Sequence, residues 1–245
     1  MLLLAVDTAT PAGSVAILRE GGLLGLVSSN VSEAYSTRLF RHVDFLLTEL
    51  QLKMEQFDVF AVAAGPGSFT GLRVGLTAAK AWAEVYGKPV VPLSSLEAVA
   101  AQASWCGHHQ ENEADDDEFL IAPVVRASRG QVCGALYSCR GKELKALDAG
   151  QACTVEEFLA YVAERTKNHS VQFVSPEPEV IQTALENSKL FSAATARGVM
   201  KASPVLAPIL GELAFHYASR GEFTDALHLD ANYIQRSDAE LTWKG

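Results

Sequence analysis

The sequence lacks several features that would place it in a class at once. It has no run of about 18 apolar residues without charge, so a membrane-spanning helix is not expected. The first ten residues lack the basic leader and the small-residue cleavage site of a signal peptide. The four cysteines, Cys106, Cys133, Cys139 and Cys153, form neither a CxxC pair nor a histidine cluster of the kind that holds zinc. We therefore expect a cytoplasmic protein with reduced thiols, no membrane contact and no metal.

Basic residues are also scarce. The chain has 20 Lys and Arg against 29 Asp and Glu, which gives a formal net charge of −9 and a pI of about 5.2. Tight nucleic-acid binding depends on Lys and Arg that release counterions from the phosphate backbone. Independent binding to RNA or DNA is therefore not expected.

The apolar content is high enough for a substantial core. The chain has 245 residues, of which 49% are hydrophobic, and this length suits two lobes of about 100 to 150 residues each. The sharpest change in composition is the acidic stretch GHHQENEADDD, which is typical of a solvated linker. The predicted division is a first lobe at 1–106, a linker at 107–117 and a second lobe at 118–245. A helix expected at 205–219 belongs either to the second lobe or packs back onto the first.

Hydrophobic periodicity predicts the elements of both lobes. Short apolar runs bounded by Pro and Gly indicate strands, and apolar residues three or four positions apart indicate helices. In the first lobe we expect strands at 2–6, 14–18, 23–28, 57–63 and 89–93, and helices at 36–50, 72–86 and 96–103, the last capped by Ser95. In the second lobe we expect strands at 119–125, 131–138 and 171–174, and helices at 155–165 and 178–186. The order of the first lobe is that of one lobe of the actin-like proteins, which predicts an α/β fold.

A first candidate site follows the strand 2–6. Asp7, Thr8 and Thr10 stand there in a short turn that ends at Gly13. In actin-like ATPases such a hairpin brings an acid near a metal ion and several backbone amides to a phosphate. Turns favour the same residue types without any ligand. The motif alone leaves both interpretations open.

A second candidate is the glycine-rich loop GPGSFTG. Gly65, Gly67, Ser68 and Thr70 are its candidate phosphate-binding residues, because the loop opens directly into a helix whose first amides point outward. The loop lacks the lysine of the P-loop pattern and the GxGxxG spacing of dinucleotide folds, so we discount both classes. A ligand-free turn between strand and helix is the alternative.

The helix after this loop carries a face of small residues. Gly71, Gly75 and Ala79 lie four positions apart, with Ala78 and Trp82 beside them. Glycine inside a helix costs about 1 kcal/mol relative to alanine, which calls for a packing reason. The face is predicted to meet a helix of a partner, or of a second copy of this chain when the partner is missing. Contact with the chain's own helix 36–50 is the alternative.

Three segments together resemble a known family. LAVDTATPAGSVAIL and AAGPGSFTGLRVGLTAAKAWA are similar to the TsaB/YeaZ family, and NYIQRSDAE resembles that family's closing motif. The match is dense in the first lobe and patchy in the second. The resemblance implies a two-lobed actin/Hsp70/sugar-kinase fold, the ASKHA or RNase H-like class. It also implies a non-catalytic scaffold that supports the catalytic paralogue TsaD in making threonylcarbamoyladenosine beside the tRNA anticodon.

The resemblance further implies partners and ligands. The expected partners are a TsaD-like paralogue as heterodimer and a TsaE-like ATPase, with a homodimer when the chain is alone. Contact with tRNA is expected only through the complex. No cofactor is expected to bind tightly, and ATP or ADP with magnesium is expected at most weakly, at the partner interface. No catalytic residue and no metal ligand is expected.

The sequence departs from the family at several positions. A histidine that is frequent before the first long helix is replaced by Tyr35. Arg126, Ser128 and Gln131 stand where the family usually has Asp, Arg and Glu, which leaves the role of those residues unassigned here. The catalytic paralogue holds its metal with two closely spaced histidines, whereas helix 36–50 offers only His42, which we expect at the surface or its boundary.

Two enzyme functions are the alternatives. An ATP-dependent kinase of the same fold would place Asp7 near magnesium and the loop Gly65–Gly71 on phosphate. Against it, the segment FVSPEPE at 173–179 has two prolines and two acids where ATP-binding relatives have a glycine-rich turn. A metallopeptidase would need a metal cluster, and adjacent His108 and His109 with the acids at 115–117 offer a poor one.

Overall fold

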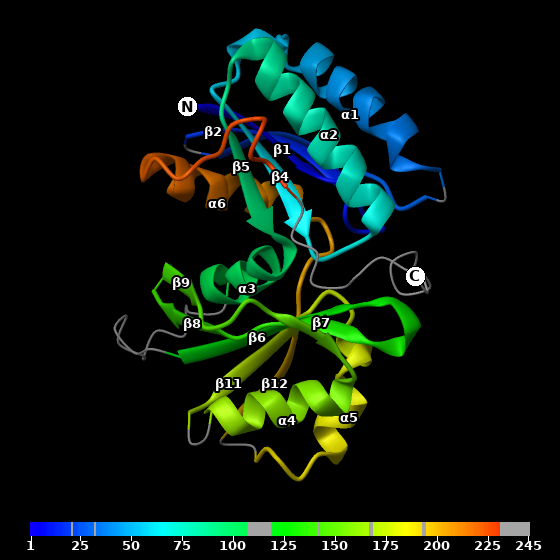
Figure 1. The fold of residues 1–245 in the computed structure, drawn as a ribbon, viewed down its shortest axis with the longest axis vertical. Helices are drawn as coiled ribbons and strands as arrows, with labels where there is room; N and C mark the ends of the chain where they lie inside the picture. The colour runs from blue at the N-terminus through cyan, green and yellow to red at the C-terminus, as the bar shows by residue number, and fades with distance from the viewer. Residues whose placement is uncertain are drawn as a thin grey trace, which may run out of the picture. The chain divides into compact units, whose positions relative to one another are not determined.

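The chain folds into two compact units. The computed structural model describes residues 1–20, 22–31, 33–106, 119–141, 143–166, 169–192 and 195–230. Among these, Met1–Ala98 and 204–230 form the first unit, and the described part of Val99–Ser203 forms the second (Figure 1). The expected linker at 107–117 and the closing motif NYIQRSDAE lie outside the described residues. The final helix, α6 (Ala207–Ser219), belongs to the first unit.

A five-stranded sheet forms the centre of the first unit. Its strands stand in the order β3-β2-β1-β4-β5, and they are β1 (Leu2–Asp7), β2 (Ser14–Arg19), β3 (Gly22–Ser28), β4 (Val59–Gly65) and β5 (Val90–Ser94). β1 pairs antiparallel with β2, so Asp7 lies opposite Ser14, and parallel with β4, so Val6 lies opposite Val62. All residues of β1 and β4 are buried, as near-continuous apolar runs require. The five strands predicted for this lobe are confirmed.

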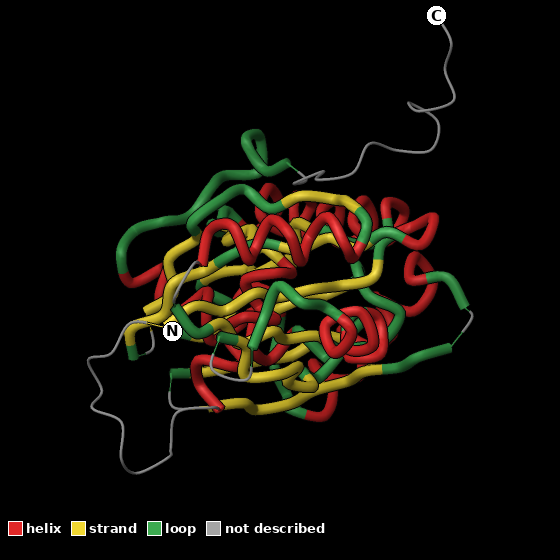
Figure 2. Tube along the Cα trace, turned by 90° about the horizontal axis from the view of Figure 1, so that it is seen from below, coloured by secondary structure: helices red, strands yellow, loops and turns green. Residues whose placement is uncertain are grey.

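Helices cover both faces of this sheet. α1 (Tyr35–Glu49) and α2 (Phe69–Tyr86) lie side by side on one face, and α6 covers the other (Figure 1). A short 3-10 turn, Met54–Gln56, precedes β4. Figure 2 marks the same elements by type, with strands in yellow and helices in red. α2 begins three residues before the predicted start because the Ser68 hydroxyl accepts a hydrogen bond from the Gly71 amide at 3.2 Å and so caps the first turn.

The cap of α3 (Ser95–Cys106) differs from the prediction by one residue. The Ser94 hydroxyl accepts a hydrogen bond from the Glu97 amide at 3.4 Å. Ser95 is buried, and its hydroxyl has no hydrogen-bond partner among the described residues. Ser94 therefore caps the helix, because a capping side chain must reach an amide two or three residues ahead.

The second unit is built on a mixed sheet with strand order β10-β7-β6-β11-β12, and a further strand, β8, pairs with β6 and β9. The strands are β6 (Phe119–Arg126), β7 (Val132–Gly134), β8 (Tyr137–Arg140), β9 (Glu143–Ala146), β10 (Gln151–Cys153), β11 (Val171–Ser175) and β12 (Ala196–Lys201). The single strand predicted at 131–138 is divided, because β7 and β8 pair with different stretches of β6. β9, β10 and β12 were not predicted, since none of them is a buried apolar run.

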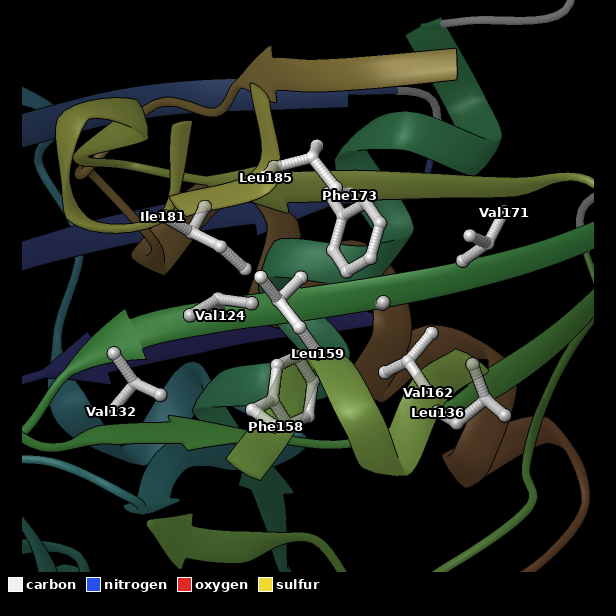
Figure 3. Packing of buried hydrophobic residues seen from close by; sticks show 11 residues of the cluster. Val124, Val132, Leu136, Phe158, Leu159, Val162, Val171, Phe173, Ile181 and Leu185 are labelled. Atoms are coloured by element: carbon white, nitrogen blue, oxygen red, sulfur yellow. The ribbon is translucent and has the colours of Figure 1, made fainter. Parts of the chain in front are cut away.

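Helices of the second unit pack on this sheet around two phenylalanines. They are α4 (Val155–Thr166) and α5 (Gln182–Asn187), and the helix predicted at 178–186 is split into the 3-10 turn Pro178–Val180 and α5. Figure 3 shows Phe158 of α4 and Phe173 of β11 among aliphatic side chains of the core. A Cβ atom at Gly134 would lie 2.4 Å from the Phe158 ring, so glycine lets α4 approach β7 closely.

Candidate functional site

The two candidate loops meet at one edge of the first sheet. The Asp7 turn follows β1 and the loop Gly65–Gly71 follows β4, and these strands are parallel neighbours, so their carboxyl ends coincide. The Ser68 amide donates a hydrogen bond to the Ala9 carbonyl at 2.8 Å. The Thr8 hydroxyl donates one to the Gly71 carbonyl at 2.7 Å. The structure thus joins the two motifs that the sequence singled out separately.

Asp7 is wholly buried, and its carboxylate is used within its own turn. Its Oδ1 accepts a hydrogen bond from the Ala9 amide at 2.8 Å, and its Oδ2 accepts one from the Thr10 hydroxyl at 2.6 Å. Burial raises the pKa of Asp7 above its usual range, and the bonds from Thr10 and Ala9 oppose that rise. Both carboxylate oxygens therefore serve the turn itself.

Glycines allow the loop and helix to approach the turn at backbone distance. A Cβ atom at Gly71 would lie 2.0 Å from the Thr8 carbonyl oxygen, and one at Gly75 would lie 2.4 Å from the Thr8 hydroxyl oxygen. A Cβ atom at Gly67 would lie 2.6 Å from the Ala9 carbonyl oxygen. Gly65 has a φ of 119°, which favours glycine. The spacing of these glycines is thereby explained by contacts inside the first unit.

The small-residue face of α2 is turned toward the chain itself. Gly71, Gly75, Ala78 and Ala79 are all buried, and Gly75 lies against Thr8 and Val62. The intrachain contact expected for the glycines was with the helix 36–50, but they meet the β1 turn and β4 instead. Trp82 is partly exposed, and its ring lies 6.2 Å from Phe40 of α1 and 5.7 Å from Phe60.

The exposed members of the candidate set lie at the start of α2. Gly67, Ser68 and Thr70 are open to solvent, although the Ser68 amide and hydroxyl already serve the turn and the helix cap. Thr10 is partly buried and binds Asp7. The polar groups at this edge thus bond to one another, with Ser68 and Thr70 at the solvent boundary.

A polar cluster on α1 was missed by the sequence reasoning. Arg38 is buried and stacks over the Tyr35 ring, its Cζ 4.2 Å from the ring centroid. Its Nη1 donates to both the carbonyl and the hydroxyl of Ser29, each at 2.8 Å. The signal was present, because Tyr35, Arg38 and His42 follow the i, i+3, i+7 spacing of one helix face.

Tyr35 and His42 complete this cluster. A Cβ atom at Gly13 would lie 2.0 Å from the Tyr35 ring, so the ring lies directly over the end of the Asp7 turn. His42 is half-buried, and its Nε2 lies 3.3 Å from the Ser29 hydroxyl. Burial and then the charges of Arg38 and Arg41 lower the pKa of His42, which favours the neutral ring.

In the second unit, the positions that depart from the family pattern form a short turn. Arg126 pairs with Glu177 through its Nε at 2.5 Å and lies 4.0 Å from Glu179, all three being exposed. The acids expected to oppose a phosphate are thus partly balanced by Arg126. The Gln131 amide donates to the Ser128 carbonyl at 3.1 Å and closes a 3-10 turn.

Metal and membrane features can be judged for the described ranges. There, no three side chains of His, Cys, Asp or Glu converge in a way that could hold a metal ion. His108, His109 and the acids at 115–117 lie outside the described residues. None of the described helices is both long and apolar enough to span a bilayer.

The sequence matches known proteins over most of its length. A family model described as "TsaD: tRNA N6-adenosine threonylcarbamoyltransferase" matches residues 14–205. The Bacillus subtilis protein named tRNA threonylcarbamoyladenosine biosynthesis protein TsaB is 28% identical over 243 residues, 99% of this chain and 98% of that protein. The protein of the same name from Haemophilus influenzae is 33% identical over 164 residues, 65% of this chain and 66% of that protein. The chain belongs to the TsaB/YeaZ family.

A solved TsaB/YeaZ structure has the same fold. YeaZ from Pseudomonas aeruginosa superposes with a TM-score of 0.74 at 24% identity, covering 94% of this chain and 98% of that one. The predicted two-lobed actin-like α/β fold is therefore confirmed for this TsaB/YeaZ member.

Proposed function

We propose that this chain is a non-catalytic partner protein in the biosynthesis of threonylcarbamoyladenosine on tRNA, and that it acts by binding a TsaD-type protein. Membership of the TsaB/YeaZ family supports the pathway, since two relatives carry that pathway in their names. Two proteins named tRNA N6-adenosine threonylcarbamoyltransferase also match part of the chain, which supports a structurally related partner.

The observation that carries the non-catalytic role is the state of Asp7. A magnesium-dependent kinase needs a carboxylate and backbone amides that face the nucleotide. Here Asp7 is fully buried, both of its oxygens are bonded inside its own turn, and the Ser68 amide is bonded to Ala9. Opening this arrangement for a metal ion would break the contacts that hold the turn to the loop. A partner role is therefore favoured over a kinase.

The net charge of the chain favours contact with tRNA through the partner. With a net charge of −9, the protein contributes little attraction for tRNA, so tRNA binds through the partner. A TsaE-like ATPase is a further partner of the complex. ATP or ADP with magnesium binds weakly, at the interface with the TsaD-type protein.

The partner surface lies on the outer side of α1 and α2. Phe40 of α1 and Val85 of α2 are 56% and 73% exposed, and the Trp82 ring of α2 contacts the Phe40 ring. We call Phe40, Trp82 and Val85 the α1–α2 surface. Exposed aromatic residues at one place are typical of a binding surface. Beneath this surface, the small residues of α2 set the distance between the helix and the sheet; they are Gly71, Gly75, Ala78 and Ala79. When the partner is missing, a second copy of the chain covers the α1–α2 surface.

Two measurements test this function. Co-expression with the TsaD-type protein of the same genome, followed by size-exclusion chromatography, should give a heterodimer that replaces the homodimer. Isothermal titration of ATP with magnesium into the isolated chain should give no turnover. Failure to form the heterodimer would overturn the partner role. Robust ATP hydrolysis that Asp7→Ala abolishes would overturn the non-catalytic role in favour of a kinase.

A further inference from the structure

Three buried polar atoms on one face of α1 have no hydrogen-bond partner in the part of the chain that the structure describes. They are Tyr35 Oη, Arg38 Nε and His42 Nδ1. Tyr35 is 8% exposed and Arg38 is 5% exposed. Buried polar atoms are ordinarily hydrogen-bonded, and an unpartnered one costs about 1 to 3 kcal/mol. Three such atoms in succession on one helix face need an explanation.

These side chains form one cluster around Ser29. Arg38 stacks on Tyr35, and the Tyr35 and His42 rings meet edge to face with centroids 6.3 Å apart. Ser29 receives two bonds from Arg38 and lies within hydrogen-bond distance of His42. The three unpartnered atoms therefore belong to one local environment, and we call these four residues the Ser29 cluster.

The cluster carries a positive charge that forms no ion pair with a carboxylate of the described residues. The Arg38 guanidinium stays protonated at any working pH, and its bonds go to Ser29 alone. In the described part of the chain, no carboxylate is within ion-pair distance of Arg38. Glu33, the acid that precedes α1, is paired with Arg41. Buried charges ordinarily have a partner of opposite sign, so an anion is the group that this cluster lacks.

The start of α1 adds donors of the same kind. Its N-cap residue, Ala34, offers no side chain to the first amides, and the first turn has no acidic residue. The Thr37 amide bonds to the Ala34 carbonyl at 3.1 Å, and the helix start carries the positive end of the helix dipole. The helix start, the Tyr35 hydroxyl and the Arg38 guanidinium thus lie within the first turn of α1 and share its positive character.

We propose that Tyr35, Arg38 and the first turn of α1 form a binding site for a small oxyanion of the phosphate class. Tyr35 Oη and Arg38 Nε donate to its oxygens, and His42 closes the cluster behind them. Ser36 and Thr37 are exposed at the same turn. The anion is either a free phosphate or pyrophosphate, or the terminal phosphate of a nucleotide.

The test is an anion titration of the isolated full-length chain. Inorganic phosphate, pyrophosphate and ATP without magnesium are each titrated while melting temperature and heat of binding are recorded. We expect a saturable rise in melting temperature with pyrophosphate for the wild type. Arg38→Met should abolish it, and Tyr35→Phe should weaken the affinity by about fivefold or more, the loss of one hydrogen bond. Arg41→Met, an exposed arginine of the same helix, is the control and should bind as the wild type.

The Tyr35→Phe variant separates a binding role from a structural one. Without anion it should melt at or above the wild-type temperature, because phenylalanine leaves no unpartnered hydroxyl buried. With anion it should gain less than the wild type does. A purely structural hydroxyl would instead lower the melting temperature equally with and without anion, and that result would overturn the proposal.

The three ligands distinguish the source of the anion. Similar affinities for phosphate and ATP would identify the phosphate group alone as the ligand, and tighter binding of ATP would identify a nucleotide; both support the site. Absence of saturable binding for all three ligands, or equal loss in the Arg41→Met control, would refute it. The site is independent of the proposed partner role, because it is measured on the chain alone.

Discussion

The Thr8 hydroxyl donates a hydrogen bond to the Gly71 carbonyl at 2.7 Å, across 63 residues of sequence. This bond joins the turn after β1 to the first turn of α2. One turn further along α2, Gly75 has no side chain and so leaves room for that of Thr8. The two family motifs are therefore one structural unit. The close contact with Thr8 explains why Gly71 and Gly75 tolerate no side chain.

Gly71→Ala should destabilise the first unit by about 2 kcal/mol, because the added Cβ would lie 2.0 Å from the Thr8 carbonyl oxygen and overpack the contact. In an open helix the same change stabilises by about 1 kcal/mol, so the sign itself is diagnostic. Urea unfolding monitored by circular dichroism measures the difference. Glu84→Ala, on the exposed side of α2, is the control; an unchanged or more stable Gly71→Ala protein would contradict the close contact.

Phe40→Glu should weaken the complex with the TsaD-type protein by about tenfold or more, which is about 1.4 kcal/mol. A charge on the α1–α2 surface must be desolvated when the partner binds. Leu190→Glu is the matched control, since Leu190 is 54% exposed and lies in the second unit. Titration calorimetry measures both affinities, after melting curves show that both variants are folded. Equal losses in the two variants would place the interface elsewhere.

Asp7→Asn should change how stability depends on pH. The pKa of Asp7 is raised in the folded chain, mainly by burial, so the folded state binds the proton more tightly than the unfolded state does. Its contribution to the free energy of unfolding is therefore full below the unfolded pKa and is lost as the pH rises through the folded one. Asparagine has no such titration. The stability of Asp7→Asn relative to the wild type should fall as the pH is lowered from 7, as guanidinium unfolding at several pH values would show.

The control for that series is Asp44→Asn, an exposed acid of α1. Its difference from the wild type should vary little over the same range. If Asp7→Asn and Asp44→Asn gave parallel curves, the buried carboxyl would not be the group that titrates.

Arg126→Ala should change the free energy of unfolding by less than about 1 kcal/mol, because an exposed ion pair is screened by solvent. Binding to the TsaD-type protein should also be unchanged, since Arg126 is far in sequence from the α1–α2 surface and belongs to the second unit. Thermal melts and a binding titration measure the two quantities. A folded Arg126→Ala chain that loses tRNA modification in a complementation assay would reveal a direct role for this guanidinium.

The pattern of apolar residues in the sequence made much of the fold predictable. The strands around Asp7 and Gly65 were found because continuous apolar runs ended by Gly and Pro leave few alternatives. β12 was missed because it has no fully buried run and its exposed residues alternate irregularly, so its strand state depends on pairing with β11. The strand expected at 131–138 failed for the same reason, since its two halves pair separately with β6.

The sequence by itself determined the two motifs, the family and the order of elements in the first lobe, because these depend on local patterns and on glycines that no other residue replaces. Only the tertiary structure decided what the motifs contact. The small face of α2 could have met a partner or the chain itself, and sequence spacing is the same in both cases. Arg38 of α1 is buried, because it stacks on Tyr35 and bonds to Ser29, which lies in the segment before the helix. Contacts between distant segments have no local signature, so they become visible only when the chain is folded.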